Sequence, residues 1–142
     1  MREILFRGKC VDMGYWVEGF YAYLYACKGH KSHRIYTGYS ETDCGVYYPD
    51  WCEVDTTTVG QFTGLTDKNG KKIFEGDIVR CISMTDMANM VVIFEDGEFR
   101  MVLCERYKNY IPGCGFYAIR CFDKEVIGNI HDNPELLKED NQ

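Results

Sequence analysis

The stretch Gln61–Val79, Q-F-T-G-L-T-D-K-N-G-K-K-I-F-E-G-D-I-V, constrains the fold more than any other part of the chain. Apolar residues flank the tetrad K-N-G-K at 68–71, and Asn-Gly is the pair that accepts positive φ at both central positions of a type I′ turn. At 75–77 the glycine of E-G-D is free to adopt left-handed backbone, and Asp77 can accept hydrogen bonds from nearby N–H groups. The sequence therefore predicts a β-hairpin followed at once by a second reversal of the chain.

Four further runs accompany this stretch: R-E-I-L-F-R-G-K at 2–9, W-V-E-G-F at 16–20, E-V-D-T-T-T-V-G at 53–60 and E-V-I-G-N-I-H-D-N-P-E-L-L at 125–137. Together with F-T-G-L-T-D-K-N-G-K-K-I-F-E-G-D-I-V they resemble the pattern of the YopX family, small proteins encoded by phages and prophages. The resemblance covers nearly the whole chain. It implies an all-β fold and a phage or prophage origin. It implies no mechanism, because the family has no established biochemical activity.

Length and composition indicate a globular protein rich in strands. The 142 residues suffice for one domain or two very small ones, and the aromatic content of 15% favours strands. The formal net charge of −6 opposes broad adhesion to nucleic acid, which requires many Lys and Arg side chains. A local basic patch remains compatible with this charge.

The eight cysteines, at 10, 27, 44, 52, 81, 104, 114 and 121, lack the two-residue spacing of a zinc knuckle or a redox motif. No apolar run is long enough for a membrane span, and the first residues alternate like a strand rather than an export signal. We therefore expect a protein of the host cell cytoplasm, with no membrane partner and with reduced thiols.

The spacing of apolar runs and turn residues predicts an all-β fold. After Asp77 the expected strands are 78–83, 90–94, 98–104, 116–122 and 125–130. Short antiparallel strands in this number favour a small SH3-like or OB-like barrel over residues 59–142, with an N-terminal β unit, residues 1–58, packed on it. The boundary between them is soft. Asn133 before Pro134 predicts one short C-terminal helical turn over 134–138.

Three loop tips carry the side chains that we expect to contact a partner. The turn 28–34 and the hairpin tip 68–72 are cationic. The segment 41–55 is expected to be a long exposed loop rich in aromatic residues, with short strands at 46–48 and 51–54 as an alternative. The candidate partner-binding residues are Lys28, Lys31, Arg34, Tyr47, Tyr48, Trp51, Lys68, Lys71 and Lys72.

These loop tips could be ordinary solvated turns or specific binding sites, and the sequence leaves both interpretations open. Cationic tips are most often solvated turns that limit aggregation, and aromatic residues often seal a sheet edge. Alternatively, Lys28, Lys31 and Arg34 could hold a phosphate or carboxylate. A further alternative is a metal site built from His30, His33, Cys44 and Cys52, although the ligand spacing is irregular.

The sequence contains no recognisable catalytic motif and indicates no cofactor or metal. It lacks a glycine-rich phosphate loop and a nucleophile elbow. The favoured interpretation is a non-catalytic accessory protein that binds a protein partner. The alternatives are a small barrel that binds nucleic acid, a homo-oligomer, or an enzyme whose site is assembled across loops from His131, Asp77, Cys104 and Cys121.

Overall fold

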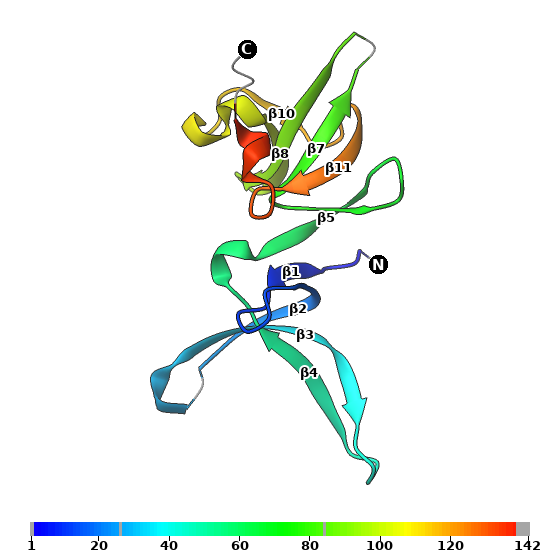
Figure 1. The fold of residues 1–142 in the computed structure, drawn as a ribbon, viewed down its shortest axis with the longest axis vertical. Helices are drawn as coiled ribbons and strands as arrows, with labels where there is room; N and C mark the ends of the chain where they lie inside the picture. The colour runs from blue at the N-terminus through cyan, green and yellow to red at the C-terminus, as the bar shows by residue number, and fades with distance from the viewer. Residues whose placement is uncertain (1, 26, 84, 139–142) are drawn as a thin grey trace. The chain divides into compact units, whose positions relative to one another are not determined.

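The computed structural model describes residues 2–25, 27–83 and 85–138, which contain eleven strands and four 3-10 helices (Figure 1). The prediction of an all-β fold is confirmed. The chain divides into two compact units, residues 1–62 and 63–142, and each is described by itself. None of the helices in the described residues has the length and apolar character needed to cross a membrane.

The first unit is an antiparallel meander. Its strands are β1 (Phe6–Lys9), β2 (Trp16–Tyr25), β3 (Lys31–Glu41) and β4 (Tyr47–Glu53). Hydrogen bonds join them in the order β4-β3-β2-β1, and β5 (Gly60–Thr66) continues the sheet by pairing its first residues with β1. The short helices η1 (Cys27–Gly29) and η2 (Thr56–Thr58) lie before β3 and β5. In the segment 41–55, expected to be a long loop, residues 42–46 form the turn after β3 and the strand β4 follows at 47–53.

The core of the first unit is small and contains a disulfide. Ile35 and Val54 are buried, and Cys10 beside them is bonded to Cys52. Cys10 and Cys52 come together because Cys10 forms an isolated β-bridge with Val54, just after the end of β4. This bridge leaves the Cα atoms of the two cysteines 5.9 Å apart, a distance that a disulfide can span. The expectation that all thiols are reduced is therefore wrong for this pair, whose partners lie 42 residues apart in sequence.

The second unit contains the remaining strands: β6 (Lys72–Phe74), β7 (Asp77–Ile82), β8 (Met87–Glu95), β9 (Glu98–Leu103), β10 (Phe116–Ala118) and β11 (Asp123–Asn129). The last five form an antiparallel sheet in the order β10-β9-β8-β7-β11. Because side chains alternate along a strand, β7 and β8 bury Val79 and Met90 on one face and Ile78 and Val91 on the other.

Two helices accompany this sheet, η3 (Cys104–Asn109) and η4 (Pro134–Leu137). The latter confirms the predicted C-terminal helical turn, as 3-10 rather than α-helix, and Leu137 packs in the cluster with Ile78 and Val91. The predicted SH3-like or OB-like barrel is wrong in one respect, because the two sheets are not closed. In the described residues β10 and β11 stay at opposite edges of their sheet instead of pairing with each other.

The predicted hairpin forms from β5 and β6, but its turn is not of type I′. Gly70 has a φ of 82°, whereas Asn69 keeps a negative φ. The turn closes with hydrogen bonds from Gly70 N to Asp67 O (3.0 Å) and from Asp67 N to Lys71 O (2.7 Å). This is the three-residue loop in which a type I turn is followed by a left-handed residue.

The side chain of Asp67 explains the choice of turn. One carboxylate oxygen accepts hydrogen bonds from the backbone N–H groups of Asn69 (2.8 Å) and Lys71 (2.9 Å). The other accepts from Val126 N in β11 (2.9 Å). Burial alone would raise the pKa of Asp67, but the three N–H donors outweigh it and lower the pKa below its usual value. The buried carboxylate therefore fixes the hairpin tip and attaches it to β11.

The second reversal follows the prediction. Gly76 has a φ of 91°, and the Asp77 carboxylate accepts a hydrogen bond from Phe74 N (2.8 Å). The backbone of Gly76 also bonds to two other parts of the second unit, donating to Val92 O and accepting from Ile130 N. The turn therefore joins β8 and the end of β11.

Replacing Asp67 with Ala should lower the free energy of unfolding by about 3 kcal/mol, because three backbone donors lose a charged acceptor. Asp67→Asn keeps one acceptor oxygen and should retain part of this stability. The contribution of the ionised carboxylate is complete above its unfolded-state pKa near 3.8 and is lost as the pH falls through the lower folded-state pKa. Urea unfolding at pH 7 and pH 3 measures this, and equal losses for Asp67→Asn at both pH values would contradict it.

Candidate functional site

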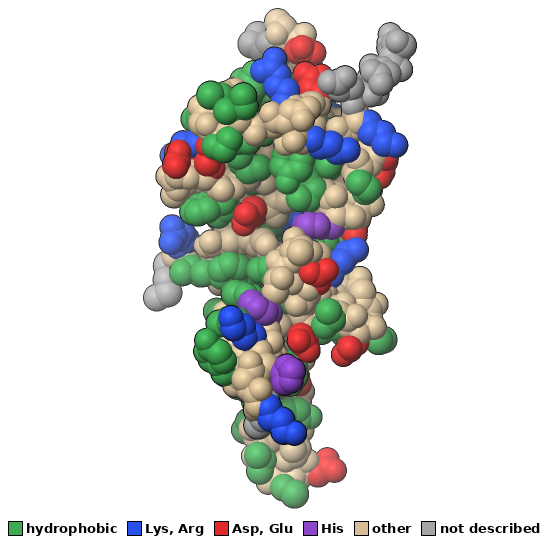
Figure 2. Space-filling model, turned by 90° about the vertical axis from the view of Figure 1, so that its left-hand side faces the viewer, with side chains coloured by type: hydrophobic (Ala, Val, Ile, Leu, Met, Phe, Trp, Pro, Cys, Tyr) green, Lys and Arg blue, Asp and Glu red, His purple; other side chains and the backbone are tan. Residues whose placement is uncertain are grey.

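The face of the first unit that carries Trp51 presents aromatic side chains from three strands. The strand register places Phe20 of β2, Tyr36 of β3 and Trp51 of β4 in one row. Leu24 lies on the same face, four residues further along β2. Phe20 is 71% exposed and Trp51 46% exposed, and green hydrophobic side chains reach the surface in Figure 2. We call Phe20, Leu24, Arg34, Tyr36 and Trp51 the aromatic face.

Arg34 provides the charge of the aromatic face. Its guanidinium lies 3.7 Å from the centre of the Trp51 ring, and its Nε donates a hydrogen bond to Ser32 Oγ (2.9 Å). Across the strands Arg34 pairs with Ala22 on one side and Glu53 on the other. These contacts hold the guanidinium over the indole ring, an arrangement that presents both an apolar surface and hydrogen-bond donors.

The same face continues across β1. Lys9 pairs with Trp16 in the register of β1 and β2, and its ammonium lies 5.6 Å from the centre of the Trp16 ring. The guanidinium of Arg7 lies 4.8 Å from the same ring. Both tryptophans of the chain are thus contacted by cations on one side of the sheet.

The sheet separates residues that the sequence groups together. Lys31 begins β3, and because it is three residues from Arg34 it points to the opposite face, where its ammonium lies near the Tyr23 ring. Lys28 lies in η1 with a φ of 68°. Lys28, Lys31 and Arg34 therefore do not form one anion site on a face of the sheet.

The other predicted partner-binding residues are also divided. Tyr47 and Trp51 share one face of β4 and Tyr48 lies on the other. Lys68 and Lys71 are exposed at the hairpin tip of the second unit, where Lys68 forms an ion pair with Glu125 (3.6 Å), and Lys72 begins β6. The candidates chosen from the sequence did not include Phe20 and Leu24. The run 15–27, in which both lie, has two largely apolar faces, a pattern that indicates a strand either covered on both sides or lying partly at an interface.

The alternative of a metal site is contradicted by one of its ligands. Cys52 is committed to the disulfide with Cys10, so it has no thiolate to offer. His33 Nδ1 is hydrogen-bonded to the hydroxyl of Tyr21. No group of three or more His, Cys, Asp or Glu side chains suited to a metal ion occurs in the described part of the chain.

The second unit has a groove of about 970 Å³ near the turn that connects β7 and β8, where Ser83 and Asp86 contribute to its lining. Cys104 contributes to its lining, together with Arg80 and Glu105. Asp77, His131 and Cys121, the other residues of the enzymatic alternative, are not among the described residues that line it. Asp77 is instead buried at the start of β7, where its carboxylate accepts a hydrogen bond from Phe74 N.

The buried thiols of this unit are poor nucleophiles. Burial raises the pKa of Cys104 to about 11, and the nearby Cys81 and Glu105 add to the effect. Burial likewise raises the pKa of Cys81 to about 11, against the opposing charge of Lys124. Both sulfurs therefore remain protonated at neutral pH, and the thiolate that covalent catalysis requires is scarce.

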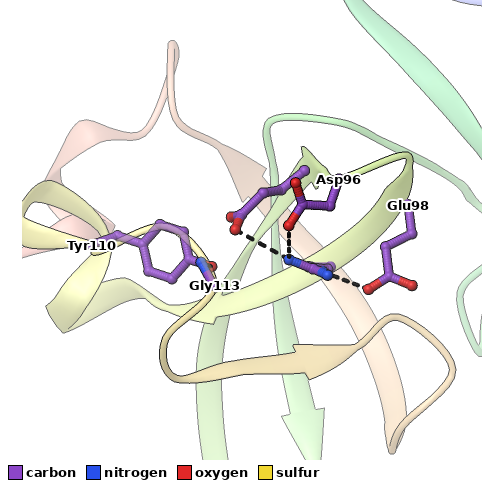
Figure 3. A network of polar contacts seen from close by, with 6 residues as sticks. Asp96, Glu98, Tyr110 and Gly113 are labelled. Carbon is purple, nitrogen blue, oxygen red and sulfur yellow. Dashed lines mark hydrogen bonds and ion pairs between the residues drawn. The ribbon is translucent and has the colours of Figure 1, made fainter.

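A polar network closes the β8–β9 hairpin (Figure 3). The buried Arg100 forms ion pairs with Glu98 (2.5 Å), Glu95 (3.1 Å) and Asp96 (3.5 Å), and its guanidinium lies 3.8 Å from the centre of the Phe116 ring. The hydrogen bond to Glu98, which outweighs the effect of burial, raises the pKa of Arg100. The partners of Arg100 are all parts of the same sheet, so the network stabilises the hairpin and its neighbour β10.

The comparisons with known proteins agree with this architecture. A family model described as YopX protein matches residues 6–138. The chain belongs to the YopX family. The YopX fold recurs in the crystal structure of protein EF1440 from Enterococcus faecalis, with a TM-score of 0.59 and 25% sequence identity over 97% of this chain and 100% of that one.

A second solved structure, protein yopX from Bacillus subtilis, has a TM-score of 0.50 and 22% identity, and the match covers 98% of each chain. At this identity the likeness concerns the fold alone. No curated protein matches the chain. The family resemblance inferred from the hairpin is thus confirmed, and the activity of this YopX protein has to be argued from its surface.

Cysteine labelling tests the disulfide and the burial of the thiols together. Raising a thiol pKa from 9.0 to about 11 lowers the thiolate fraction about 100-fold, so iodoacetamide should alkylate Cys104 and Cys81 far more slowly than the exposed Cys121. Cys10 and Cys52 should be labelled only after reduction. Peptide mass spectrometry reads the sites. Equal rates at Cys104 and Cys121, or labelling of Cys52 without reductant, would contradict the structure.

Proposed function

We propose that this YopX protein is a non-catalytic accessory protein of phage or prophage origin that binds a protein partner through its aromatic face. The observation that carries the proposal is the stack of Arg34 on Trp51 beside the exposed Phe20. Trp, Tyr and Arg are the residues that contribute most binding energy in protein interfaces. On the aromatic face these residue types project from an ordered sheet, and Trp and Tyr have few rotatable bonds to immobilise on binding.

Charge favours a protein over a nucleic acid as the partner. The chain carries a net charge of −6, and Glu53 lies directly opposite Arg34 on the aromatic face. Binding to a polyanion would rely on a row of unopposed cations. A nucleic acid stacked on Trp16 and Trp51 remains the second candidate, supported by the cations that contact both rings.

Two observations support a non-catalytic role. The thiols of Cys81 and Cys104 stay protonated at neutral pH. Asp77, a carboxylate that could have served as a base, accepts a backbone hydrogen bond in a tight turn. We place the protein in the host cell cytoplasm, where the disulfide between Cys10 and Cys52 would be an exception to the reduced state of most thiols.

The test compares retained proteins between matched variants. Tagged wild-type protein should retain a specific protein from host or phage-infected lysate, and Trp51→Ala should retain at least about tenfold less, since truncating an interface anchor costs about 2 kcal/mol or more. Arg34→Ala should act in the same direction. Ile111→Ala removes an apolar side chain of the second unit that is even more exposed, at 67%, and should retain the wild-type amount.

The proposal is wrong if Trp51→Ala retains the same protein as efficiently as the wild type. The nucleic-acid alternative is tested separately by fluorescence anisotropy with labelled single- and double-stranded oligonucleotides at low and moderate salt. Micromolar binding at low salt that weakens as salt rises and is lost in Trp51→Ala would favour nucleic acid over protein.

A further inference from the structure

The strand β2 has one uncovered edge. Its residues Phe20–Tyr25 pair with β3 on one side. On the other side the pairing with β1 ends at Phe6 opposite Gly19, and the chain before Phe6 turns to β5, where Leu5 O accepts from Phe62 N. None of the described strands pairs with Phe20–Tyr25 on that side. Alternate N–H and C=O groups of this segment therefore point away from the sheet.

Other strand edges carry the features that prevent pairing with a second chain. β4, the outermost strand on the far side of β3, has Pro49, which has no N–H, and the charged Asp50 and Glu53. β6 and β10 have three residues each, too few for a stable ladder. These edges are protected by sequence or by length.

The edge of β11 is protected by the hairpin tip. Lys68 N donates to Lys124 O (3.0 Å), and the Asp67 carboxylate accepts from Val126 N. A bulge between Val126 and Gly128 interrupts the strand further. The Asp67 turn therefore satisfies backbone groups that an outside strand would need.

The segment Phe20–Tyr25, F-Y-A-Y-L-Y, has none of these features. It contains no charged residue, no proline and no glycine. Phe20 and Leu24 project on the aromatic face, and Tyr23 and Tyr25 on the opposite one; Tyr25 is 73% exposed. An unpaired, uncharged strand edge of this kind is a template for another strand.

We propose that this edge pairs with the same edge of a second copy of the chain, antiparallel and about a two-fold axis perpendicular to the sheet. In an antiparallel pair, directly opposed residues lie on the same face of the sheet. The two-fold axis must therefore lie between two copies of the same residue, and Ala22 and Tyr23 are the two residues at the centre of the segment. The product is one continuous sheet in the order β4-β3-β2-β2-β3-β4. A second copy fits because the segment is uncharged, so identical edges meet without repulsion, and because the aromatic side chains of both copies then adjoin on both faces.

Sedimentation velocity on the wild-type protein is the first test. A six-residue edge is small, so the dimer should be weak, and the average mass should rise from 16.5 kDa toward twice that value over roughly 5 to 500 µM, as expected of an interface near the lower size limit. A mass that remains that of the monomer over this range overturns the proposal. So does self-association that continues past the dimer, because two-fold pairing consumes the edge.

Charge exchange at Tyr23 is the second test. The two Tyr23 side chains lie directly opposite each other if the axis is at Tyr23, and diagonal to each other if it is at Ala22. Tyr23→Lys and Tyr23→Glu should therefore each be monomeric, because like charges repel across the pair. Mixing the two variants in equal amounts should restore dimer, which also shows that both are folded. Tyr39→Lys is the control. Tyr39 lies on β3, away from the proposed edge, and is about as exposed as Tyr25, so this variant should dimerise like the wild type.

The proposal is overturned if Tyr23→Lys dimerises as the wild type does, or if the mixture stays monomeric while both variants show the wild-type circular dichroism. These outcomes are independent of the proposed partner site, because the edge is tested with purified protein alone and the partner is tested through Trp51.

Discussion

The buried carboxylate of Asp67 is the interaction on which the second unit most depends. It accepts three backbone hydrogen bonds, two from its own hairpin turn and one from Val126, 59 residues later in the sequence. Local turn chemistry and long-range topology are therefore joined in one side chain. The turn after β6 acts similarly on a smaller scale, because the Asp77 carboxylate closes it and Gly76 bonds to both β8 and the end of β11.

Local rules predicted the reversals but not always their geometry. The Asp96-Gly97 pair has positive φ at both residues, as a type I′ turn requires. Asn69-Gly70 has the stronger sequence signal for that turn and does not adopt it. The difference is Asp67, which holds the N–H groups of the turn in the type I arrangement. Its bond to β11 depends on tertiary structure, which the residues around the turn do not encode.

In the candidate site, too, the sequence identified residues but not the contacts that depend on how distant strands pair. The sequence identified Arg34 and Trp51 as partner-binding candidates, but their stacking follows from the register of β3 and β4. The disulfide between Cys10 and Cys52 likewise follows from the position of β4 beside the end of β1. Sequence alone does not specify register between strands separated by a loop, so both features were missed.

The account is tested most directly by following the backbone amide signals of Asn69, Lys71 and Val126 by NMR from pH 7 to pH 2. If one carboxylate accepts from all three groups, the three signals should shift together with a single midpoint below 3.8, and Asp67→Asn should abolish the common transition. Separate midpoints, or a Val126 signal that does not respond while Asn69 and Lys71 do, would contradict the link between the hairpin and β11.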